Sequence, residues 1–154
     1  MRNSLTLTIA FTVLTFHVIS QCDTSLFKIN SSSKQSWMGG FSWAHGTSYT
    51  FNITFLKDVK IRFDSVWINT NHAIPIKNIY YKSEKGSDFE KDQKFIMFAS
   101  DNYSARPEID EEKKLNSKCP IDFNGDAVIR FYIKRKVYYY IVSDIQILPT
   151  LEYP

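Results

Sequence analysis

Two cysteines carry the chemistry that matters most for where this chain resides. Cys22 directly follows an apolar stretch, whereas Cys119 lies near the end of a long polar segment. The thiol of Cys22 can form a thioether to a lipid, or it can form a disulfide with Cys119. Closing a loop of about a hundred residues stabilises a fold by about 4 to 5 kcal/mol in the chain-entropy model. Because one sulfur atom cannot do both, the two fates of Cys22 exclude each other.

Other residue types that support catalysis or metal binding are sparse. Only His45 and His72 are histidines beyond residue 21, and no CxxC, HExxH or EF-hand pattern occurs. Ser42 and His45 lie among glycines, but their segment lacks the GxSxG spacing of a nucleophile elbow. No pair stands out among the 16 acidic residues. The sequence therefore predicts a protein that is not an enzyme and that uses no metal or cofactor.

The first 21 residues predict an export signal. Arg2 supplies a positive start, and residues 5–19 form an apolar stretch diluted by threonines and one histidine. This stretch is shorter than the roughly 20 apolar residues of a transmembrane helix, and no later run is longer. We expect residues 1–21 to be removed and residues 22–154 to form a single domain.

The charge of the mature chain argues against a nucleic-acid partner. Arg2 is the only charged residue among the first 21, so 18 basic and 16 acidic residues leave a net charge of +2. Acidic and basic residues are interleaved, so no strong field is available for phosphate backbones. The one basic cluster, residues 134–136, is typical of a solvated hairpin tip.

Alternating apolar and polar residues predict strands along most of the chain. Residues 49–55 place aromatic and apolar side chains at every second position, which puts them on one face of an extended strand. Residues 59–63 repeat the pattern, but its phase then slips, because Val66 and Ile68 are apolar at even positions. A β-bulge near residues 64–65 would accommodate this slip.

The spacing of the strands and the high aromatic content, 16% of the chain, predict an all-β fold. We expect an antiparallel β-sandwich, immunoglobulin-like by default, with a barrel as the alternative. Two segments, residues 82–93 and 101–120, are predicted as loops, the second functional, disordered or partly helical. The predicted strands are residues 26–30, 49–55, 59–68, 73–81, 94–100, 127–134 and 137–147, the last being two strands or one bent strand.

The large aromatic residues have two interpretations. They could form a flat stacking platform for sugars on one face of the sheet, or they could fill the core. The core is the more favoured interpretation. Consecutive tyrosines at 138–140 must point to alternating faces. The residues concerned are Trp37, Trp43, Trp67, Tyr80, Tyr81, Tyr138, Tyr139 and Tyr140.

Several short segments together resemble a group of small exported proteins of Bacteroidetes, especially flavobacteria. They are residues 37–40 (WMGG), 46–49 (GTSY), 63–68 (FDSVWI), 124–129 (NGDAVI) and 151–154 (LEYP). The resemblance covers the chain from about residue 35 to its end. Proteins of this group are often lipoproteins without an assigned activity, so the resemblance implies a compartment and an anchor but no catalytic residue.

The position of Cys22 favours lipidation, because a bacterial lipoprotein signal ends directly before its cysteine. We therefore expect a lipid-anchored protein of the bacterial cell envelope that binds an unknown protein or glycan, or that serves a structural role. Cleavage after Ser20 is the alternative, with Cys22 free or bonded to Cys119 in a secreted, carbohydrate-binding or carbohydrate-active protein. A eukaryotic secreted protein is a third possibility, because the triplets at Asn30, Asn52 and Asn102 match the N-glycosylation pattern. A chain rich in Asn and Ser also contains such triplets by chance.

Overall fold

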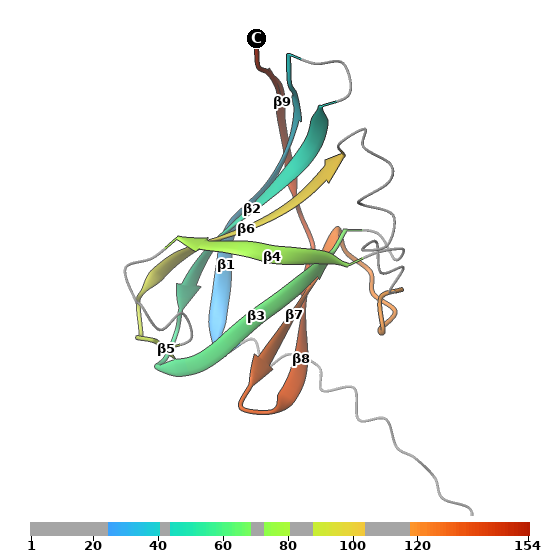
Figure 1. The fold of residues 1–154 in the computed structure, drawn as a ribbon. Helices are drawn as coiled ribbons and strands as arrows, with labels where there is room; N and C mark the ends of the chain where they lie inside the picture. The colour runs from blue at the N-terminus through green and yellow to red at the C-terminus, as the bar shows by residue number, and fades with distance from the viewer. Residues whose placement is uncertain (1–24, 41–43, 69–72, 81–87, 104–117) are drawn as a thin grey trace, which may run out of the picture.

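The protein is all-β in the computed structural model, which describes residues 25–40, 44–68, 73–80, 88–103 and 118–154. Nine strands form one curled, mixed sheet in the order β8-β7-β3-β4-β6-β2-β1-β9, and β5 pairs with β3 beside this path (Figure 1). The described residues contain no helix. The strands are β1 (Phe27–Met38), β2 (His45–Phe55), β3 (Val59–Trp67), β4 (Ile74–Tyr80), β5 (Asp88–Phe89), β6 (Lys94–Tyr103), β7 (Ala127–Ile133), β8 (Lys136–Val142) and β9 (Gln146–Glu152).

Each predicted strand is present, and the segment 137–147 resolves into parts of two strands, β8 and β9. The predicted antiparallel pairing holds for every ladder except β1–β9, which is parallel. The short strand β5 lies inside the predicted loop 82–93, and β6 extends to Tyr103, beyond its predicted end. The remainder of the second predicted loop, residues 104–117, lies outside the described residues.

Strand β1 is much longer than its predicted five residues. Its polar half, residues 31–36, has no apolar alternation, yet it pairs with β2 on one side. From Ser33 onward it also pairs with β9 on the other side. Ladder hydrogen bonds to neighbouring strands therefore keep this polar segment extended, although its side chains do not alternate between apolar and polar.

The core is built mainly from phenylalanines that the curl of the sheet brings together. The ring of Phe27 on β1 lies 5.7 Å from that of Phe63 on β3 and 5.4 Å from that of Phe131 on β7, measured between centroids. Such edge-to-face contacts are favourable beyond the area they bury. Strands from opposite ends of the path thus face one core, whose largest buried members include Phe27, Phe51, Phe55, Phe95, Phe131 and Met97.

The predicted bulge in β3 is confirmed. Phe63 pairs with Phe131, and Ser65 pairs with the preceding residue of β7, Arg130, so Asp64 is the extra residue. After the bulge, Val66 is buried in the same core as Phe63. One inserted residue thus restores the core-facing phase of the strand.

The basic triplet at 134–136 forms the tip of the β7–β8 hairpin, as predicted. Ile133 pairs with Lys136 across a two-residue loop, and Lys134 adopts a positive φ of 57°. All three basic residues are exposed. The register of this hairpin also determines which backbone groups of β8 face β7.

Candidate functional site

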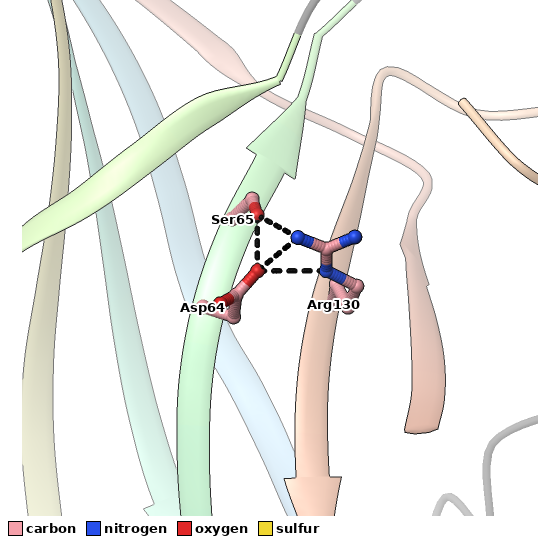
Figure 2. Close-up of polar contacts among 3 residues, drawn as sticks. All are labelled: Asp64, Ser65 and Arg130. Carbon is pink, nitrogen blue, oxygen red and sulfur yellow. Dashed lines mark hydrogen bonds and ion pairs between the residues drawn. The ribbon is translucent and has the colours of Figure 1, made fainter. Parts of the chain in front are cut away.

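A compact polar cluster lies on the outer face of β3 and β7, where the bulge brings three side chains together (Figure 2). The Arg130 Nε donates to Asp64 Oδ2 at 2.7 Å, and its terminal nitrogen forms an ion pair with the same oxygen. That nitrogen also donates to Ser65 Oγ at 3.0 Å, and the Ser65 hydroxyl donates to Asp64. We call these three residues the Asp64 cluster.

The bulge explains why the cluster forms. Two consecutive residues of a bulged strand oppose one residue of the partner strand, so Asp64 and Ser65 both reach toward Arg130. The guanidinium also lies over the indole of Trp67, 5.0 Å from the ring centroid. A cation over an indole face is a favourable contact, so Arg130 is held from two directions.

The electrostatics of Asp64 favour a carboxylate that is charged at neutral pH. Burial alone would raise the pKa of this carboxyl, but hydrogen bonds from Ser65 and Arg130 and the charges of Arg130 and Arg62 outweigh it. The pKa is therefore lowered from its ordinary value of 3.8. A general base needs a pKa close to the working pH, so Asp64 is poorly suited to remove a proton from Ser65. The three side chains of the cluster thus contact one another across the bulge.

Cys119 lies beside this cluster, in a second, smaller core on the outer face of the sheet. It is 6% exposed, forms no disulfide with any described residue, and packs with Trp67 and Val128. Burial raises the pKa of the thiol, which keeps it protonated and a weak nucleophile. Cys22 lies outside the described residues, so both its lipidation and its disulfide with Cys119 stay predictions.

Of the other residues considered for chemistry, the structure describes only His45. His45 is exposed at the start of β2, while Ser42 and His72 lie outside the described residues. Within the described part of the chain, no group of three or more His, Cys, Asp or Glu side chains could hold a metal ion.

The aromatic residues are divided between two cores. Trp67 is fully buried in the smaller core, against which Tyr139 packs, whereas Tyr138 and Tyr140 pack against the main core. The alternation of these three tyrosines between the two faces is as predicted. Trp37 is half-buried, and its ring would lie 2.8 Å from a Cβ added to the paired Gly46. Trp43, Tyr81 and the side chain of Tyr80 lie outside the described part of the chain.

A groove of about 290 Å³ lies between β1 and β8. At one end of the groove, β9 pairs with β1 from Ser33 onward. Along the rest of the groove, the strand opposite β1 is β8, which pairs with β7. The Ser32 hydroxyl donates to the Asp144 carbonyl oxygen where the two segments separate. We call this gap the β1–β8 split; its lining residues are Ile29, Asn30, Ser31, Ser32, Tyr140, Ile141, Val142, Ser143, Asp144 and Gln146.

Backbone groups of β1 face the split without a ladder partner. The Leu56 N–H donates to the Leu26 carbonyl, so in this register Leu26 and Lys28 direct their backbone groups toward β2. Backbone groups alternate sides along a strand. Those of Phe27 and Ile29 therefore face away from β2, toward the split, and no ladder of the described strands includes this side.

Strand β8 also has backbone groups that face away from its neighbouring strand. The two-residue hairpin makes Ile133 and Lys136 a hydrogen-bonded pair, so even-numbered residues of β8 direct their backbone groups toward β7. The Val142 carbonyl, which accepts from the Asp126 N–H, fits this alternation. The backbone groups of Tyr139 and Ile141 therefore face away from β7. The groove is thus flanked by two strand edges that form no ladder with each other in the described structure.

In comparisons with known proteins, no protein-family model, curated protein or solved structure matches the chain. The resemblance to exported proteins of Bacteroidetes therefore stays a prediction. In the part of the chain that the structure describes, no helix is long and apolar enough to cross a membrane.

Proposed function

We propose that this chain is an exported, non-enzymatic binding module that a lipid on Cys22 holds on a bacterial envelope membrane. The observation that carries the binding role is the β1–β8 split, where two strand edges flank a groove. The Asp64 cluster contains the side chains best suited to chemistry, but they form hydrogen bonds with one another. Binding through the groove is thus better supported than catalysis.

The proposed tether lies close to the split. β1 begins at Phe27, five residues after Cys22, and an extended chain of that length spans at most about 18 Å. The split begins at the same end of β1. A lipid on Cys22 would therefore present the groove near the membrane surface, to partners that reside there.

Labelling with a fatty acid in a bacterial host tests the tether. Wild-type protein is expected to take up label and to fractionate with membranes, and Cys22→Ser is expected to lose both properties. Cys119→Ser is the matched control and should keep both. An unlabelled protein whose localisation is unchanged by Cys22→Ser would contradict the tether.

The intact mass of the mature protein separates the alternatives in one measurement. Diacylglycerol on Cys22, the loss of two hydrogens in a disulfide, and sugars on Asn52 each change the mass differently. We expect the diacylglycerol.

A secreted glycan-binding protein is the second candidate, supported by the half-buried indole of Trp37. Sugars bind to exposed aromatic faces. Trp37→Ala should abolish any binding on a glycan array, and Tyr153→Ala, an exposed aromatic on the C-terminal tail, is the control. A wild-type chain that binds no glycan would remove this candidate.

The immunoglobulin-like sandwich is likewise a proposal about the fold. It is supported by the main core, to which strands from both ends of the sheet contribute. An experimental structure in which β7 and β8 form a layer facing β1 and β2 would support it, whereas a continuously closed barrel would not.

A further inference from the structure

We propose that the β1–β8 split binds an extended peptide from another protein, which adds to the sheet as a strand. The proposal rests on the proposed function, because it names the partner of the binding module. Strand addition uses main-chain hydrogen bonds for affinity and the flanking side chains for specificity. Both features can be assigned to residues of the split.

The main-chain partners come from both sides of the groove. The two registers direct the N–H and C=O groups of Ile29 on β1 and Ile141 on β8 toward the gap. Phe27 and Tyr139, two residues earlier on each strand, direct theirs to the same side. Paired backbone groups are the rule in sheets, and unpaired edges are templates for a further strand. A peptide in the split would pair on two sides, whereas a peptide on an outer edge pairs on one.

The inner face of the groove restricts the side chains of the peptide. Tyr140 lines the groove, and its ring stacks on that of Phe27, which is 1% exposed, with centroids 5.0 Å apart. A peptide side chain that points toward these packed rings meets little free space. Side chains alternate between the two faces of a strand, so every second residue of the peptide must be small.

The side chains at the mouth of the groove determine which polar and charged residues the peptide should carry. It carries hydroxyl and amide groups, such as those of Ser31, Ser143 and Gln146, and the only charged residue among the described lining residues is Asp144. The groove volume of about 290 Å³ is at the lower end of binding clefts, roughly 300–1,000 Å³. The expected partner is a short, extended segment with small residues at alternate positions, neutral polar residues between them, and a basic residue at one end.

The test is a titration of the isotope-labelled full chain with a short capped peptide of alternating alanine and threonine that ends in lysine. We expect the largest amide shift changes at Ile29 and Ile141. The control peptide is N-methylated at alternate amides and cannot donate to the strand edges. Its binding should be weaker by about tenfold or more, because each lost hydrogen bond costs about 1 kcal/mol.

Substitution at the mouth adds a second readout. Asp144→Asn should weaken binding of the lysine peptide by about two- to fivefold, the range of an exposed ion pair. Asp122→Asn, an exposed acid outside the groove, should leave it unchanged.

The proposal is overturned if the peptide causes no shifts at millimolar concentration, if the shifts centre on β9, or if N-methylation leaves the affinity unchanged. These outcomes would not affect the tether, which the labelling of Cys22 decides separately.

Discussion

The regular pairing of the sheet is interrupted at two places, and the side chains around them differ. At one place side chains contact one another, and at the other a groove is left. At the bulge in β3, Asp64 is left without a ladder position, and the side chains of Ser65 and Arg130 close around it. At the β1–β8 split, the β1–β9 ladder ends at Ser33, and β1 residues that precede it line a groove. The side chains at the bulge thus contact one another, whereas at the split the described strands leave two edges without a ladder between them.

The difference predicts a large stability effect at the bulge. Arg130→Met should lower the free energy of unfolding by about 2 to 3 kcal/mol, because it leaves the Asp64 carboxylate half-buried without its ion pair. Both side chains are 29% exposed, which keeps the loss below that of a fully buried pair. Urea denaturation measures it.

Arg62→Met is the matched control. Arg62 is exposed and lies 4.6 Å from the centroid of the Tyr132 ring, so its loss should cost less than about 1 kcal/mol. Equal losses for the two arginines would contradict a special role for Arg130.

The contribution of Asp64 should depend on pH. Its pKa in the folded state is lowered below the ordinary value of 3.8, so its stabilisation is complete above that pH and is lost as the pH falls through the folded-state pKa. Asp64→Asn should be less stable than wild type by about 1 kcal/mol at neutral pH. Denaturation curves should show the gap closing below about pH 4. A gap that stays constant down to pH 2 would contradict this assignment.

A smaller loss of stability is expected from substituting Ser32, at the end of the β1–β8 split. Ser32 is 8% exposed and its hydroxyl donates to the Asp144 carbonyl, so Ser32→Ala should cost about 1 kcal/mol. Ser143→Ala, an exposed serine in the same groove, should change stability by less than about 0.5 kcal/mol. If Ser143→Ala proved the more damaging change in thermal denaturation, the split would be a packed region and not an open groove.

Much of the fold could be predicted because local sequence patterns encode it. Alternation located the strands, the phase slip between Phe63 and Val66 located the bulge, and the basic triplet located a hairpin. The parallel pairing of β9 with β1 was not predictable, because it joins segments more than a hundred residues apart and Pro149 interrupts any alternation. Long-range pairing depends on the whole sheet and not on either strand alone.

The candidate sites were harder to predict for the same reason. The sequence indicated a bulge, but the identity of its partner, Arg130, depends on the register of β3 against β7. The β1–β8 split has no side-chain signature, because its main feature is backbone that lacks a neighbouring strand. Only the arrangement of β1, β8 and β9 in space reveals it.

Amide hydrogen exchange in the free protein shows whether the strand edges at the split lack hydrogen-bond partners. The amides of Lys28 and Tyr140 face neighbouring strands, whereas those of Ile29 and Ile141 face the groove. We predict exchange at Ile29 and Ile141 faster by about a hundredfold or more than at these neighbours. Equal protection of all four amides would show that the split is closed and would contradict the account.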